Sequence, residues 1–283
     1  MKKITITLTV LMAFTIFVNA QTTTSPTTPL VSKKGYTILP QAGDYAIGID
    51  AVPMLKYAGN IFNNTANNTA AFNFKEGQSI YLKSFIDEKT AYRAKVRIGW
   101  DTKKNKELIL KNGETEADQT VEDIQKIAVK NFLVGFGKEY RRGYGRLQGF
   151  YGFEGALSYG ANKTTYEYGN DYTSIYPAPA STDFGSNKIG TNRVLTDKAG
   201  SVLGIGLRGF VGVEYFVAPK ISLGGEFGWG LVYQRTGTGE KEVESMNFGS
   251  GQSETTTTEV AGGNSFVIDT DNMAGCIYLL FHF

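Results

Sequence analysis

The chain has little of what most catalytic and metal-binding sites require. It holds one cysteine, Cys276, and one histidine, His282, among 283 residues. A single copy therefore supplies no disulfide framework, no Cys/His zinc site and no pair of imidazoles, and we expect no metal and no cofactor. A large excess of basic charge is missing too, because 29 Lys and Arg stand against 27 Asp and Glu, and Lys2 and Lys3 lie at the very start. Nucleic acid is not an expected partner of such a chain.

Long apolar runs are absent except near the start. Residues 4–18 are largely apolar, follow Lys2 and Lys3, and lead to the small residue Ala20. This pattern predicts a secretory signal peptide over residues 1–20, cleaved after Ala20. An uncleaved membrane anchor is the alternative, although the run is short for a helical span. Residues 21–43, which begin "QTTTSPTTPLVSKK", are Thr/Pro-rich and are expected to form a periplasmic tether.

Alternation of apolar and polar residues with a period of two recurs along the rest of the chain. In residues 90–101, for example, Tyr92, Val96 and Trp100 share one face, while Arg93 and Arg97 lie on the other. Such alternation is typical of a strand with two different environments. Eight segments follow this pattern with varying clarity: 44–57, 79–86, 90–101, 132–140, 146–159, 203–217, 221–233 and 273–283.

The connections between these segments alternate in length. Short links lie at 87–89, 140–145 and 218–219, and long polar links lie near 58–78, 102–127, 161–200 and 236–264. Short turns at one rim and long loops at the other are typical of outer-membrane barrels. The sequence therefore predicts an all-β fold, an eight-stranded antiparallel up-and-down transmembrane β-barrel over residues 44–283, with four long outer loops and three short periplasmic turns.

The apolar rows are expected to face lipid. A water-soluble barrel of the lipocalin kind would place its apolar row inside, but here the apolar rows are the longer and more aromatic ones, and glycine shares the other face with charged residues. Aromatic side chains near the ends of these rows predict the interfacial girdles of a membrane barrel. The expected girdle residues are Tyr45, Tyr57, Trp100, Tyr159, Trp229 and Tyr233.

Three stretches carry a resemblance to known proteins. The C-terminal "CIYLLFHF" resembles the sorting signal of bacterial outer-membrane barrels, with Ile277, Leu279, Phe281 and Phe283 as its alternating residues. Residues 39–62 and 138–157 resemble outer-membrane β-barrel proteins common in Bacteroidetes, and the plan is similar to the small OmpA/OmpX type. The resemblance implies recognition by the barrel-assembly machinery, and it concerns fold and location rather than activity. We expect no peptidoglycan-binding domain after the barrel.

Charged residues on the other face are expected to fill the lumen. An eight-stranded barrel is only wide enough for its own side chains, and the two signs are balanced there. We interpret the charges as a structural ion-pair network rather than as general acids and bases. The expected network comprises Asp50, Arg93, Lys95, Arg97, Glu139, Arg146, Glu154, Arg208, Glu214 and Glu226.

Turn positions predict which of these charges meet. A tight turn over 140–145 would place Glu139 directly opposite Arg146. The turn at 87–89 would oppose Lys83 and Arg93, so that Glu139 on the next strand is needed to offset them.

A second group of charges is expected higher in the lumen. Strands of equal height would place Glu154 opposite Arg208, with Glu226 as a diagonal neighbour of the same arginine. Removal of Arg208 would then leave two carboxylates unpaired.

His282 and the long loops leave alternatives open. A His–Ser pair of the kind used by lipid A-modifying barrels would need a serine beside His282, and none is expected; a rim position near Asp44 is the other interpretation. Residues 120–130 either form a short helix begun at Thr120 or extend the following strand. The tyrosine-rich loop over 161–200 has a paratope-like composition, or it folds against its neighbours.

The sequence therefore predicts fold and location better than activity. The first hypothesis is a non-enzymatic outer-membrane barrel that serves envelope integrity or presents its loops to partners. A porin-like small-solute channel is the alternative, and a lipid-directed enzyme the third. Expected partners are outer-membrane lipid and the barrel-assembly machinery, and the expected state is a monomer.

Overall fold

The structure is a computed structural model that describes residues 29–51, 79–116, 118–270 and 276–283. The expected signal peptide, residues 21–28 of the expected tether, and Tyr57 of the expected girdle lie outside these ranges. The described residues form thirteen strands and contain no helix long and apolar enough to cross a membrane.

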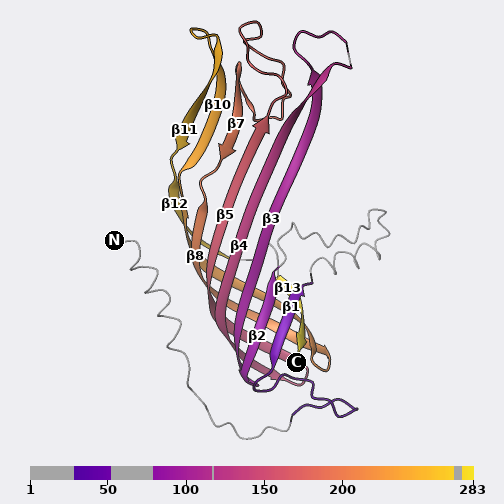
Figure 1. Cartoon of the computed structure of the whole chain (residues 1–283). Coiled ribbons are helices and arrows are strands. Elements are labelled where there is room, and N and C mark those ends of the chain that lie inside the picture. The colour runs from indigo at the N-terminus through magenta and orange to yellow at the C-terminus, as the bar shows by residue number, and fades with distance from the viewer. Residues whose placement is uncertain (1–28, 52–78, 117, 271–275) are drawn as a thin grey trace.

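Eight antiparallel strands form a ring (Figure 1). They are β1 (Tyr45–Asp50), β2 (Ile80–Asp87), β3 (Thr90–Leu110), β4 (Thr120–Tyr144), β5 (Leu147–Glu167), β8 (Val202–Ala218), β9 (Ile221–Thr236) and β13 (Cys276–His282). Each pairs with the next in this order, and β13 pairs with β1, where Ile47 lies opposite Phe281. All eight expected segments contribute one strand each.

Three short turns join the ring strands at the end where the chain terminates. Asp87 accepts a hydrogen bond from the backbone N–H of Lys89 (2.7 Å) in the first turn, and Lys220 has a positive φ (60°) in the third. The second turn consists of Gly145 and Arg146, because β4 continues to Tyr144. The expected turn over 140–145 is therefore wrong. Gly145 has a φ of 63°, which suits the first central position of a two-residue hairpin loop.

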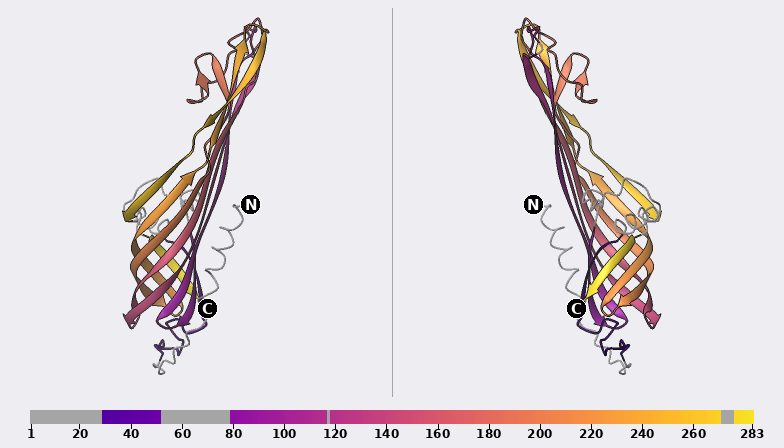
Figure 2. Two further views of the ribbon diagram at one scale, coloured as in Figure 1. Left: turned by 90° about the vertical axis from the view of Figure 1, so that its left-hand side faces the viewer. Right: turned by 90° about the vertical axis from the view of Figure 1, so that its right-hand side faces the viewer.

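The upper parts of β3, β4 and β5 continue beyond the ring into an open sheet (Figures 1 and 2). With β7 (Asn192–Lys198), β10 (Gly239–Asn247) and β11 (Gln252–Val260) they form six strands in the order β11-β10-β7-β5-β4-β3, which we call the extension sheet. The two-residue β6 (Lys188–Ile189) pairs with β7, and β12 (Gly263–Thr270) pairs with β9. Much of the expected loops 102–127, 161–200 and 236–264 is thus strand. Residues 120–130 belong to β4, so the strand alternative is correct there and the helix is wrong.

The two faces of the ring strands differ as the alternation requires. Apolar side chains such as Leu207, 65% exposed, point outward. The inward face carries the charged residues described below together with a buried apolar cluster of Ala46, Tyr81, Phe85, Ala91, Phe150, Phe210, Tyr278 and Leu280. The interior is therefore packed with side chains.

Candidate functional site: a buried ion-pair cluster

The inward charges gather in one cluster inside the ring, and the strand register positions them. Lys83 on β2 lies opposite Arg93 on β3, and Glu154 on β5 lies opposite Arg208 on β8. The cluster comprises four bases, Lys83, Arg93, Arg141 and Arg208, and four acids, Glu139, Glu154, Glu214 and Glu226.

The lower half of the cluster joins two carboxylates to two bases. Lys83 Nζ lies 2.9 Å from Glu139 Oε2 and 3.0 Å from Glu214 Oε2. Arg141 Nη1 donates to the same two acids, at 2.8 Å and 2.9 Å. The side chains of all four residues are at most 2% exposed. Opposite charges at this separation, shielded from water, attract strongly.

Arg93 links the two halves. Its Nη1 and Nη2 donate to both oxygens of Glu226, at 2.8 Å and 3.0 Å, and its Nε lies 3.2 Å from Glu154. Its Nη1 also lies 3.7 Å from Glu139. Arg208 Nη1 donates to Glu154 and Glu226, at 3.1 Å and 2.9 Å. Every carboxylate of the cluster therefore contacts two or more bases.

Aromatic rings fill the space around these charges. The Arg93 guanidinium lies 4.1 Å from the centre of the Phe210 ring, and Lys83 Nζ lies 4.8 Å from that of Phe150. Arg141 lies 5.3 Å from the Phe85 ring. These are cation–π distances, and the rings also exclude water from the ion pairs. Charge balance and close packing suit the cluster to closing the ring interior.

Several expected members of the network lie elsewhere. Glu139 lies opposite Gly152 rather than Arg146, because the turn begins at Gly145 and not at residue 140 as expected. Arg146 occupies that turn and donates to the backbone carbonyls of Phe216 and Val217. Lys95 lies against the Tyr81 ring. Asp50 lies opposite Tyr278 on β13, and Arg97 lies opposite Leu133 on β4.

Arg141 is the member of the cluster that the sequence reasoning missed. Alternation along β4 could have identified it, because residues 139 and 141 point to the same face of a continuous strand. The expected turn at 140–145 ended the strand before residue 141, so Arg141 was not assigned to the inward face.

His282 is buried with Ser222 and Glu214. His282 Nε2 lies 2.9 Å from Ser222 Oγ and 3.2 Å from Glu214 Oε1, and Ser222 Oγ donates to the same carboxylate at 2.6 Å. The expectation that no serine lies beside His282 is therefore wrong. Asp44, expected near His282, pairs with Lys220, whose carbonyl accepts a hydrogen bond from the His282 backbone N–H at 2.8 Å. In a nucleophile–base–acid relay the acid would hold the other ring nitrogen. Here serine and acid share Nε2, and Nδ1 has no hydrogen-bond partner among the described residues.

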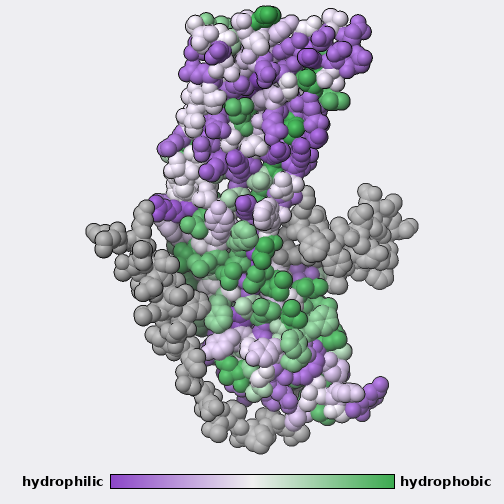
Figure 3. Space-filling view, in the orientation of Figure 1, coloured by the Kyte–Doolittle hydropathy of each residue, from purple (hydrophilic) through white to green (hydrophobic). Residues whose placement is uncertain are grey.

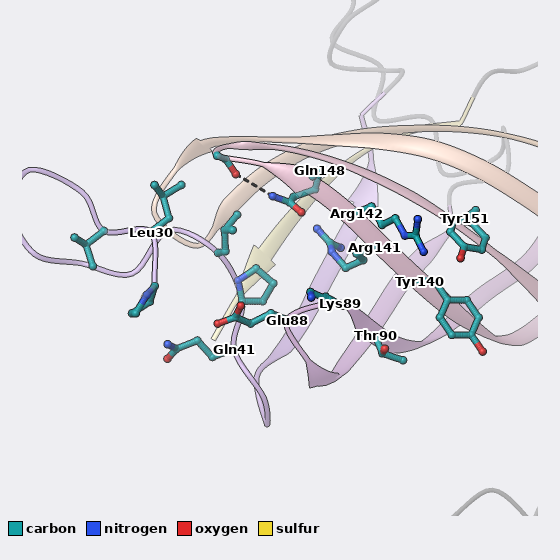
Figure 4. A pocket seen from close by; sticks show the side chains of 16 residues that line it. Leu30, Gln41, Glu88, Lys89, Thr90, Tyr140, Arg141, Arg142, Gln148 and Tyr151 are labelled. Atoms are coloured by element: carbon teal, nitrogen blue, oxygen red, sulfur yellow. Dashed lines mark hydrogen bonds between the residues drawn. The ribbon is translucent and has the colours of Figure 1, made fainter. Parts of the chain in front are cut away.

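A cavity of about 990 Å³ opens at the end of the ring where the short turns lie (Figure 4). The segment 29–41 forms one wall through Leu30, Pro40 and Gln41, and the ends of β3, β4 and β5 form the other. Arg141 and Gln148 both line the cavity, and Gln148 donates a hydrogen bond to Gly145 O at 2.9 Å (Figure 4). Arg141 belongs both to this wall and to the cluster, so the cluster closes the cavity on its inner side.

The expected girdle and C-terminal residues lie on the outer face. Tyr45, Trp100, Tyr159, Trp229 and Tyr233 are exposed, Trp100 most of all at 71%. Tyr45 stacks on Phe283, with ring centres 6.4 Å apart. Ile277 and Leu279 are half-buried, whereas Phe281 and Phe283 are exposed.

The tyrosine-rich segment after β5 folds against its neighbours. The Arg193 guanidinium lies 4.3 Å and 4.4 Å from the ring centres of Tyr168 and Tyr172 and pairs with Glu244 at 2.9 Å. The Tyr168 hydroxyl donates to Val194 O at 2.7 Å, and burial raises its pKa to about 12. Tyr176, by contrast, is exposed.

A buried aspartate holds this segment to β4. Asp123 accepts hydrogen bonds from the backbone N–H groups of Gly169 (2.8 Å) and Thr182 (2.7 Å). The segment is therefore folded against the extension sheet.

Among the described residues, no group of three or more His, Cys, Asp or Glu side chains could hold a metal ion.

No family model and no curated protein matches the chain. Among solved structures, it is similar to the outer membrane protein OprG from Pseudomonas aeruginosa, with a TM-score of 0.29 and 9% identity over 87% of this chain and 98% of that one.

Proposed function

We propose that this chain is a non-enzymatic, integral outer-membrane β-barrel whose ring spans the membrane and whose interior is closed by the ion-pair cluster. One observation carries the proposal: the ring strands present apolar side chains outward and buried charges inward. A water-soluble protein rarely exposes a contiguous apolar area above a few hundred Å². In Figure 3 the apolar surface forms a zone on the ring, below the polar extension sheet.

The apolar rows have the height of a bilayer core. On β5 the outward row runs from Leu147 to Tyr159, both exposed, and Lys163 above it is polar. Twelve residues at ~3.3 Å each, tilted by about 40°, cover roughly 30 Å. Tyr159 and Tyr233 would then lie near the upper interface and Tyr45 at the lower one, as girdle residues do, whereas Trp229 is level with Phe153, halfway along the row.

The cluster argues against steady conduction. An eight-stranded ring leaves room for little more than its own side chains, and here four ion-paired bases, four acids and several aromatic rings occupy it. A porin-like channel is the alternative function. Single-channel recording in planar bilayers separates the two, because a closed interior gives rare, small events, whereas large and steady conductance would establish the channel.

The role that fits a closed barrel is envelope integrity or surface interaction through the extension sheet. Ser222 and Glu214 both contact the same ring nitrogen, Nε2, of the buried His282. We therefore propose that these three residues are structural and do not carry out lipid-directed chemistry. A lipid A mass profile of a deletion strain tests this, and a changed acyl pattern that the wild-type gene restores would contradict it.

Membrane insertion is tested by folding. The purified protein should fold only in detergent or lipid, and it should migrate faster unheated than boiled in a denaturing gel, because a closed barrel has no edge at which unfolding begins. Solubility in plain buffer with a strand-rich circular dichroism spectrum would overturn the proposal.

A further inference from the structure

The extension sheet has two free edges within the described part of the chain. β11 pairs with β10 on one side only. β3 pairs with β2 only as far as Val96, although it pairs with β4 up to Leu110. An unpaired edge presents backbone N–H and C=O groups that another strand can bind.

The two edges differ in charge. β11 reads "QSETTTTEV" and contains Glu254 and Glu259 but no basic residue. Upper β3 contains Lys103, Lys104 and Lys106. Lysines are a common protection of edge strands, and β11 lacks this protection while its four threonines favour strand pairing.

Like charges lie side by side at both edges. Glu259 on β11 is directly opposite Glu240 on β10, and Lys104 on β3 is directly opposite Lys126 on β4. Directly opposed like charges destabilise a sheet. The inner member of each pair already contacts an opposite charge within the sheet, Glu240 with Lys198 at 3.7 Å and Lys126 with Glu167 at 2.6 Å. A basic strand placed beside β11, or an acidic strand beside β3, would add an opposite charge next to the outer member, Glu259 or Lys104.

The Glu240–Glu259 pair and the Lys104–Lys126 pair lie on the same face of the extension sheet, and the strand register places them within two residues of each other along the strands. Directly opposed residues share one face, and the register connects Lys104 through Lys126, Thr165, Thr196 and Glu242 to Thr257. In the same way Thr102 is level with Glu259. The β3 edge of a second molecule, set beside β11 at the same level, would therefore place Lys104 diagonal to Glu259.

Strand direction allows this pairing. Five successive antiparallel pairs separate β3 from β11, so the two strands run in opposite directions. Copies inserted in one membrane share one orientation, and β11 of one copy beside β3 of the next is then antiparallel, like every strand pair in this protein. A two-fold axis along the membrane normal would instead pair β11 with β11 in parallel.

We propose that the β11 edge of one copy binds the upper β3 edge of a second copy, so that the extension sheets join side by side. This replaces the monomer expected from the sequence, and it rests on the proposed function only in that membrane insertion aligns the copies. The contact is heterologous, since two different edges meet, and it therefore continues from copy to copy.

Cysteine cross-linking tests the contact. In a Cys276→Ser background, Lys104→Cys is placed in one tagged copy and Thr257→Cys in another, and the two are co-expressed and oxidised in membranes. We expect a heterodimer band for this pair and none when either variant is expressed alone. A chain that carries both substitutions should give a ladder of multimers.

Charge exchange supplies a matched control. For this exchange the cysteines are placed at Lys106→Cys in one copy and Thr255→Cys in the other, which the same register sets opposite each other and which leaves Lys104 and Glu259 available. Lys104→Glu in the Lys106→Cys copy should abolish the heterodimer, and Glu259→Lys in the Thr255→Cys copy should restore it. The heat-dependent gel shift is measured in the same samples. Absence of the heterodimer with an intact gel shift overturns the proposed contact and leaves membrane insertion standing, whereas absence of the gel shift rejects insertion itself. Cross-linking of Thr257→Cys copies to one another would show a two-fold contact and also overturn the proposal.

Discussion

Replacing Arg93 should destabilise the protein more than replacing Arg208, the other arginine that contacts Glu154 and Glu226. Arg93 is 3% exposed and contacts three carboxylates, those of Glu226, Glu154 and Glu139. Arg93→Met keeps much of the side-chain volume but leaves four buried acids with three bases. Removing one partner of a buried ion pair costs about 3–5 kcal/mol, and we expect a loss of unfolding free energy in that range.

Arg208→Met is the matched control. It removes the same charge, but Glu154 and Glu226 both keep Arg93, and the Arg208 side chain is 16% exposed and so remains partly hydrated. A loss of about 1–3 kcal/mol is expected. The sequence argument, in which removal of Arg208 leaves two carboxylates unpaired, is wrong because Arg93 contacts both.

A charge-balanced double variant separates electrostatics from packing. Arg93→Met with Glu226→Gln restores neutrality, and groups in one network couple by about 0.5–3 kcal/mol. Urea unfolding in lipid vesicles, followed by the gel shift, measures all three variants. The reasoning fails if Arg93→Met costs less than Arg208→Met, or if the double variant is less stable than Arg93→Met alone.

Three further predictions concern other parts of the chain. Deletion of Phe283 should lower the amount of protein in the outer membrane without blocking its export, as shown by immunoblots of membrane fractions; unchanged levels contradict a C-terminal assembly signal. Gly137→Ala should prevent folding, because its Cβ would meet Glu154 Cβ at 2.6 Å, whereas Gly155→Ala, whose nearest contact is 3.8 Å, should fold normally in the gel-shift assay. The segment around Tyr168 should become more sensitive to protease between pH 10 and pH 12, because the unfolded tyrosine ionises near pH 10 and the folded one near pH 12, so that rising pH favours unfolding. In Tyr168→Phe that increase should be smaller.

The faces of the ring strands could be predicted from the sequence, because parity needs only the period of the strand. Lys83, Arg93, Glu139 and Glu226 all lie inward, where alternation places them. Lys83 and Arg93 are opposed because the Asp87–Lys89 turn is short and lies where the sequence indicates it.

Register depends on the exact turn, and there the sequence was less informative. The stretch "YRRGYGR" offers two glycines, and a turn fits at either. Only Gly145 adopts a positive φ. With the turn at Gly145 and Arg146, Glu139 moves away from Arg146, and Arg141 joins Glu139 inside the ring.

The extension sheet could not be predicted from alternation for a physical reason. Above the ring most side chains of β3 and β11 are exposed, and the buried positions of β4, such as Asp123 and Gln125, are polar. Selection for an apolar face is therefore weak, and the segments read as polar loops. Backbone hydrogen bonding persists, since each N–H and C=O still gains a partner in a ladder. The surviving signal is weaker: β11 carries four consecutive threonines, which favour strands, beside a β10 in which three glutamates alternate. In a polar sheet of this kind, charge pairing across strands, as between Lys106 and Glu122 or between Lys126 and Glu167, replaces burial as the determinant of register.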